Sequence, residues 1–327
     1  MYNKKLSYQI STDSRIRKPK ILDRTDRHID YSNFKDSRIR EIIKEFVTVL
    51  ESNFNKDSLT NFYNNINNVS INRKRLYVLS GDNGFFESDY DDNNPKKIVV
   101  RDYPYLYHEL FHLASYSFDK DTKFNGFSEE YEEDGVYYTV GDAINEGYTE
   151  LLARRYFKDK YIVSAYHYQV SVVEKLEIII GKEKMQEMYL KSDLNGLIKE
   201  LEKYTSYDVI RDFLMYNDFL MYNYLAKMDK KLKEEVLEEA KSEVNDFLAG
   251  VYLVQQQQRR DDKEIDEEEY LNNLSNFINL FKIDNGDGTY SYPDNSDEID
   301  EILKIIKGKD DSKVYNKELK KNIMWPT

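Results

Sequence analysis

The sequence predicts an α+β protein in which a small sheet and its helices are followed by a mainly α-helical C-terminal half. Three short apolar segments, at 75–80, 85–86 and 97–101, are separated by Gly, Asn, Asp and Pro, as expected of strands and turns. Apolar residues at helical spacing occur at 38–54, and from residue 142 onward almost every segment has this spacing.

Two further helices are expected in the first half. One covers 102–117, because Pro104 is tolerated in a first helical turn, and the second runs from 142 to 157. The connection between them, 117–141, contains a predicted hairpin whose turn is Asp134-Gly135.

The second half is predicted to be a series of amphipathic helices at 161–180, 183–190, 193–203, 206–224, 228–254 and 270–282. The glutamine run that begins at Gln255 is interpreted as a solvated helix extension or a linker. Residues 284–290 resemble a calcium loop, but glycines stand where oxygen ligands are needed, so we expect a hairpin or turn.

Composition narrows the possible chemistry. The chain has 327 residues, four histidines and no cysteine, which excludes disulfides, thiolate nucleophiles and cysteine-bound metals. Residues 1–40 carry 11 basic and five acidic side chains, a net of +6, so the remainder carries −19 of the total of −13. This acidic balance argues against a nucleic-acid enzyme. Neither a membrane span nor a secretory signal is visible, so we expect a cytoplasmic protein.

Residues 108–112 read His-Glu-Leu-Phe-His. On a helix, positions i and i+4 share one face, so His108 and His112 can bind a single metal ion. Imidazole nitrogens suit Zn²⁺, which leads us to expect one zinc ion per chain. Glu109 lies beside these ligands without being one of them, where a general base for zinc-activated water is needed.

A catalytic zinc site needs a third protein ligand, which without cysteine must be His, Asp or Glu. Glu146 and Glu150, in the segment Asn-Glu-Gly-Tyr-Thr-Glu, are i and i+4 on the second helix. One carboxylate can bind zinc while the other accepts a hydrogen bond from a zinc-bound imidazole. Taken alone, such an acid pair is usually an exposed face, and its proximity to the histidine pentad is what favours zinc.

These two motifs, HELFH and NEGYTE, resemble those of the gluzincin zinc metallopeptidases over about residues 97–157. The resemblance implies that His108, His112 and Glu146 bind zinc and that Glu109 is the catalytic base. It also implies that Glu150 steadies a zinc-bound histidine. The spacing of 34 positions between His112 and Glu146 is longer than in thermolysin-like enzymes. The whole chain is similar to uncharacterised proteins of AT-rich Gram-positive bacteria or their mobile elements.

The resemblance implies a zincin-like metallopeptidase domain at 41–181. It would be preceded by a basic arm at 1–40 and followed by a helical domain at 182–282, then by a turn, short helix and tail at 283–327. The predicted activity is hydrolysis of peptide bonds in a peptide or protein substrate. The alternative is a zinc-binding, catalytically silent protein with this fold and a binding or regulatory role.

Three finer expectations concern the substrate. Gluzincins place a His or Tyr against the oxyanion, and His167 is the candidate here, with Tyr166 and Tyr168 beside it and Tyr138 as an outsider. Within the helix expected at 161–180, the spacing of Tyr166 is that of a core residue. The strand at 97–101 could align an extended peptide by strand addition. The 117–141 connection could act as a lid or plug, and its acidic run predicts a preference for basic residues near the cleaved bond.

Overall fold

The computed structural model describes residues 28–74, 84–88, 95–119, 122–133, 136–161, 165–221, 230–293 and 296–308. It confirms the α+β class. The chain divides into two compact units, Met1–Val170 with Lys182–Leu197, and Ser171–Gly181 with Ile198–Thr327.

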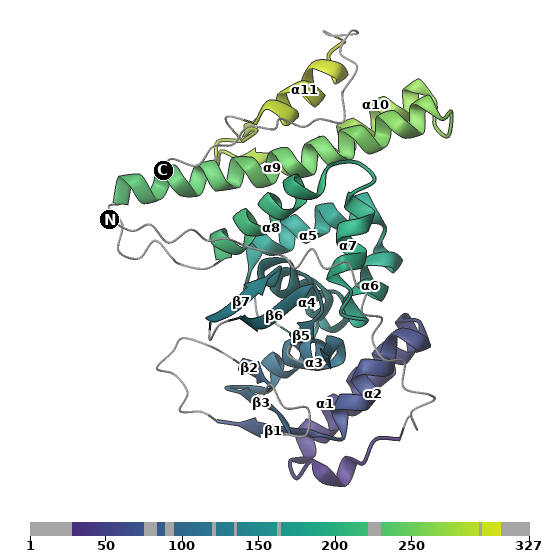
Figure 1. Cartoon of the computed structure of the whole chain (residues 1–327), viewed down its shortest axis with the longest axis vertical. Helices are drawn as coiled ribbons and strands as arrows, with labels where there is room; N and C mark the ends of the chain where they lie inside the picture. The colour runs from purple at the N-terminus through teal and green to yellow at the C-terminus, as the bar shows by residue number, and fades with distance from the viewer. Residues whose placement is uncertain are drawn as a thin grey trace. The chain divides into compact units, whose positions relative to one another are not determined.

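The described part of the first unit begins with a short 3-10 helix (Tyr31–Asn33), which is followed by α1 (Ser37–Asn53) and α2 (Thr60–Ile66). A three-stranded sheet of β1 (Val69–Arg73), β2 (Gly84–Glu87) and β3 (Lys96–Val100) comes next. The strand order is β1-β3-β2, with β1 parallel and β2 antiparallel to β3. The helix α3 (Leu106–Ser115) lies against β2 and β3 (Figure 1). The sheet therefore supports one side of α3.

A second, four-stranded antiparallel sheet, in the order β4-β5-β6-β7, follows α3. Its strands are β4 (Tyr116–Asp119), β5 (Thr122–Asn125), β6 (Ser128–Glu133) and β7 (Val136–Val140). The expected hairpin is confirmed by the antiparallel pairing of β6 with β7. Its turn, Asp134-Gly135, lies outside the described residues. The connection between α3, which carries the histidine pentad, and α4 (Asp142–Phe157), which carries Glu146 and Glu150, is thus a small sheet. These are the two motif helices.

Aromatic packing fixes α1 against the two motif helices. Asp36 caps α1 by accepting hydrogen bonds from two backbone N–H groups in its first turn. The fully buried Phe46 ring lies 4.9 Å from Phe111 of α3 and 5.6 Å from Phe157 of α4 (Asp142–Phe157), between ring centroids. Such edge and stacked contacts favour one arrangement of the three helices.

The remaining helices are α5 (His167–Ile180), α6 (Lys182–Leu190), α7 (Leu194–Leu201), α8 (Tyr207–Met221), α9 (Lys230–Asp261), α10 (Glu267–Ile278) and α11 (Asp297–Ile306). A two-stranded hairpin, β8 (Ile283–Asp284) with β9 (Tyr290–Ser291), confirms the turn expected at 284–290. Among the described residues, no helix combines the length and apolar character needed to cross a membrane.

Several expectations need correction. The strand expected at 75–80 lies outside the described residues, and β1 was not anticipated. The helix expected at 161–180 begins only at His167, because Tyr166 has a left-handed backbone. The helix extension expected at the glutamine run is confirmed, because α9 continues to Asp261, but it is not wholly solvated. Gln256 is 2% exposed and accepts a hydrogen bond from Asn273.

Candidate metal centre

The helix α3 is buried along its whole length, although it carries two histidines and a glutamate. His108, Glu109 and His112 are 7%, 5% and 4% exposed. Burying an ionisable group is costly unless it has hydrogen-bond or ionic partners. A buried helix with two histidines and a glutamate within five residues is typical of a functional site.

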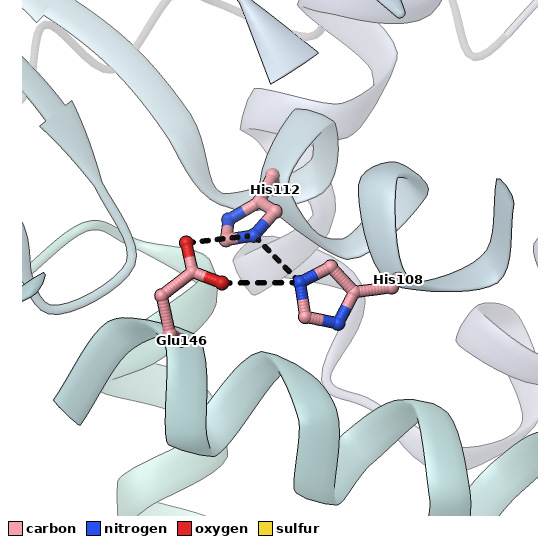
Figure 2. A group of neighbouring side chains, drawn as sticks. All are labelled: His108, His112 and Glu146. Atoms are coloured by element: carbon pink, nitrogen blue, oxygen red, sulfur yellow. Dashed lines mark hydrogen bonds and ion pairs between the residues drawn. The ribbon is translucent and has the colours of Figure 1, made fainter. Parts of the chain in front are cut away.

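The two histidines meet Glu146 of α4. The Nε2 atoms of His108 and His112 are 3.1 Å apart, and each lies near one Glu146 oxygen, at 3.2 and 3.3 Å (Figure 2). Ligand atoms around a tetrahedral zinc with bonds of about 2.0–2.1 Å are about 3.3 Å apart. The spacing and the donor set therefore fit Zn²⁺, and this group is the candidate metal site found in the described residues.

Glu150 lies one turn further along α4 and its side chain is fully buried. Its Oε2 atom lies 3.2 Å from His108 Nδ1 and also accepts a hydrogen bond from the Tyr161 hydroxyl. Its Oε1 atom accepts hydrogen bonds from Arg154 Nε, at 2.8 Å, and from the backbone N–H of Ala165, at 3.1 Å. An ionised carboxylate at this position accepts a hydrogen bond from Nδ1–H, which keeps the proton on Nδ1 and leaves the lone pair of His108 Nε2 for a metal.

Asn145 plays a matching role beside the other histidine. Its amide nitrogen lies 3.5 Å from His112 Nδ1, while its Oδ1 atom is buried and has no hydrogen-bond partner in the part of the chain that the structure describes. The two ends of an Asn amide have nearly the same shape, and hydrogen bonding decides between its two orientations. With Oδ1 facing Nδ1–H, the buried oxygen gains a partner and His112 Nε2 is free to bind a metal.

Charge on these groups is strongly coupled. Burial lowers the pKa of His108, but hydrogen bonds to Glu146 and Glu150 outweigh this effect and raise the pKa to about 10. Burial raises the pKa of Glu146, yet the neighbouring histidines hold it well below its usual range. The pKa of Glu150 is likewise lowered, mainly by His108 and Tyr161 against the effect of burial. A protonated His108 thus supplies the positive charge beside these two carboxylates.

A turn at Ala165 brings an aromatic ring to the site. The Ala165 N–H donates to Glu150, and its carbonyl accepts a hydrogen bond from Arg154 Nη2. The next residue, Tyr166, has a φ of 54°, and its ring lies nearly parallel to His108 with centroids 6.0 Å apart. A left-handed tyrosine is strained by about 1 kcal/mol or more, and such strain persists where neighbouring contacts impose it. Tyr166 is 37% exposed, so the expectation from its spacing that it is a core residue is wrong.

The other expected residues are less tightly placed. His167 is exposed at the first position of α5. Tyr138 stacks on Tyr131 within the second sheet, with centroids 5.4 Å apart. In the acidic run, Glu130 forms an ion pair with Lys123 at 3.2 Å. A preference for basic substrates and a lid or plug role for the 117–141 connection stay predictions.

The expectation that the strand at 97–101 aligns a peptide is wrong. β3 is the central strand and is hydrogen-bonded to β1 and β2 on its two sides, so it has no edge to offer. Among the described strands, β2 lies at the edge of this sheet, and its first residue, Gly84, is next to the Glu109 carboxylate.

Sequence reasoning missed four residues that contact the histidines or the neighbouring glutamates: Gly84, Asn145, Arg154 and Tyr161. Two of these carry a local signal, because Asn145 directly precedes Glu146 and Arg154 is i+4 from Glu150. Gly84 and Tyr161 come close to the site only because distant segments of the chain fold together. A single sequence does not indicate such contacts.

Comparison of the chain with protein-family models, with curated proteins and with solved structures gave no match. The function must therefore be argued from the site itself.

Proposed function

We propose that this protein is a zinc-dependent peptidase that hydrolyses peptide bonds with Glu109 as general base. The observation that carries the proposal is the convergence of His108 Nε2, His112 Nε2 and the Glu146 carboxylate at tetrahedral spacing, with Glu109 on the same helix. Three ligands leave one coordination position for water or substrate, which is typical of catalytic zinc sites.

We further propose that the first unit is a zincin-like catalytic domain. This assignment is supported by the arrangement of the β1-β3-β2 sheet, α3 against that sheet and α4 against α3. α3 and α4 supply all three proposed ligands from a rigid, aromatic-packed core. Rigid elements hold catalytic groups more accurately than loops do.

In the proposed reaction, Glu109 accepts a proton from the attacking water and delivers it to the leaving amine. His108, His112 and Glu146 would hold the zinc ion, which supplies a Lewis acid that polarises the carbonyl and makes hydroxide available near neutral pH. Glu150 and Asn145 keep the two imidazoles in the ligand tautomer through hydrogen bonds at Nδ1.

An extended peptide would add to the edge of β2. An edge strand offers backbone N–H and C=O groups that a substrate can pair with, and alternate side chains then give specificity. β2 supports this role because Gly84, at one of its ends, adjoins Glu109. A peptide on this edge passes beside the proposed general base.

The oxyanion would be stabilised by Tyr166 or by His167, the residue that the sequence favoured. Tyr166 has the stronger geometric support, because its ring stacks on His108 while its backbone is held through Ala165. A phenolic O–H that donates to developing negative charge is a common form of transition-state stabilisation.

The decisive experiment combines metal analysis with digestion of a peptide library, on the wild type and Glu109→Gln together. We expect one zinc per chain in both proteins and cleavage by the wild type alone, since the amide cannot accept the water proton. Undiminished cleavage by the variant would refute the role of Glu109. One zinc per chain without cleavage in either protein would favour the catalytically silent binding protein.

A further inference from the structure

Gly84, the first residue of β2, leaves a space that the Glu109 side chain occupies. A Cβ atom placed on Gly84 would lie 2.7 Å from Glu109 Oε1 and 3.3 Å from both Cδ and Cγ. In proteins a Cβ atom essentially never lies within 3.0 Å of a non-bonded heavy atom. Gly84 has no positive φ, so its backbone conformation is open to any residue. The neighbouring carboxylate, and not the backbone, is what excludes a side chain here.

The atoms that would clash belong to the end of a flexible side chain. At Gly147, by contrast, a Cβ would meet the backbone carbonyl of Gln169 at 2.6 Å, which only a shift of the chain could relieve. An alanine at position 84 is therefore compatible with the fold, and the displacement falls on Glu109. Because β3 holds Gly84 opposite Val100 in the ladder, the strand has little freedom to retreat.

We propose that Gly84 is a positioning residue for Glu109, an inference that rests on the peptidase function proposed above. The absent side chain admits the carboxylate between α3 and β2, and the strand limits the rotamers that Glu109 can adopt. A general base must stay within hydrogen-bond reach of the proton that it accepts. A misplacement of about 1 Å in a catalytic group can cost about 100-fold in rate.

The test uses the full-length zinc protein with Gly84→Ala. We expect unchanged zinc content, a kcat lowered about 100-fold on the peptide that the wild type cleaves best, and a KM within about threefold. Gly196→Ala is the matched control, because its Cβ would also displace a carboxylate, that of Asp193. That variant should keep wild-type kinetics.

Glu109→Asp tests whether the clash is the cause, because aspartate is one methylene shorter and leaves room for a Cβ atom on residue 84. Adding Gly84→Ala to Glu109→Asp should cost less than about fivefold in kcat, against about 100-fold in the wild-type background. Equal losses in both backgrounds would overturn the proposal. If Gly84→Ala alone fails to fold, the double variant should fold, and its failure would also overturn the proposal.

Binding of acetohydroxamate, followed by calorimetry, separates this inference from the proposed function. A hydroxamate chelates zinc and offers a proton to an adjacent carboxylate, so Gly84→Ala and Glu109→Gln should weaken its binding alike. If the wild type cleaves no peptide but shows this pattern, the peptidase proposal fails and the positioning role stands. Wild-type hydroxamate affinity in Gly84→Ala, loss of zinc from that variant, or a wild type that holds no zinc would each overturn the positioning role.

Discussion

The Nδ1 atom of His108 lies 3.2 Å from Oε2 of Glu150, whose side chain is completely buried. This contact joins the two motif helices on the side of the imidazole that faces away from the proposed metal. Because Glu150 also binds Arg154 and the Ala165 N–H, it links His108 to the turn that carries Tyr166. One carboxylate thus contacts the imidazole of a proposed metal ligand and the neighbouring turn at Ala165.

Glu150→Gln should weaken zinc binding about 10- to 100-fold, which is typical when a hydrogen-bond partner of a ligand is changed. The amide keeps the size of the side chain but loses the charge that holds Nδ1–H and Arg154. The dissociation constant is measured by competition with a chromophoric chelator. Glu51→Gln, which makes the same change at a carboxylate bonded to Tyr63, is the control and should retain wild-type affinity. An unchanged constant in Glu150→Gln would contradict the orienting role.

The metal-free protein should lose stability as the pH rises from 7 toward 10, and the zinc protein should not. The pKa of His108 is about 10 in the folded state and 6.5 without these partners, so the folded chain holds an extra proton in this range. The free energy of unfolding that His108 contributes is fully present below pH 6.5 and is lost as the pH rises to about 10. The loss is up to about 1.4 kcal/mol per pH unit. Zinc requires the neutral imidazole, which removes this dependence.

The measurement is the melting temperature between pH 7 and 9.5, with EDTA and with stoichiometric zinc. The difference between the two curves isolates the site, because groups elsewhere titrate in both. We expect the stabilisation by zinc to grow with pH. A difference that stays constant across this range would argue against a protonated His108 in the metal-free protein.

Much of the site was predictable because its signals are local. The pentad from His108 to His112 needs only the i, i+4 spacing of one helix, and Glu146 and Glu150 share a second helix in the same way. The bounds of α4, 142–157, were predicted correctly, since Gly141 ends the strand before it with a φ of 82°. Periodicity suffices where a helix is long and its ends carry clear signals.

The parts that were not predictable depend on contacts between distant segments. Tyr166 has the spacing of a core residue in a helix from 161, but Glu150 and Arg154 hold Ala165 and delay the helix to His167. The central place of β3 follows from pairing with strands on both sides, which its apolar sequence cannot reveal. β1 was missed because its sequence, Val-Ser-Ile-Asn-Arg, has only two apolar residues.

Lys175→Met should stabilise the protein at pH 7 by about 1–2 kcal/mol, because burying an unpaired charge is unfavourable. Lys175 is 5% exposed, and its Nζ donates to Ser171 Oγ at 2.7 Å and lies 4.7 Å from the centre of the Phe281 ring. Burial lowers its pKa to about 8, against the opposing charge of Glu174. Methionine retains the unbranched shape over the ring.

The pH dependence gives a second check on Lys175. Between pH 8 and 10.5 the unfolded chain holds a proton that the folded chain has released, so this residue makes stability rise with pH. Denaturant unfolding of the wild type and Lys175→Met should therefore converge as the pH increases through this range. Lys199→Met, at an exposed position of α7, is the control and should change stability by less than about 0.5 kcal/mol. A destabilised Lys175→Met at pH 7 would show that the ammonium contacts outweigh the cost of burial.

Substitutions of Tyr166 and His167 should show which of the two residues stabilises the oxyanion. Tyr166→Phe keeps the ring on His108 and removes only the hydroxyl, so zinc content should be unchanged while kcat falls about 100- to 1,000-fold. KM should stay within a few-fold, because the hydroxyl would act on charge that develops only in the transition state. His167→Ala should remain close to the wild type, and the reverse pattern would favour His167.

Arg154→Gln should lower kcat in part, since it releases the Ala165 carbonyl that helps to hold Tyr166 in its left-handed conformation.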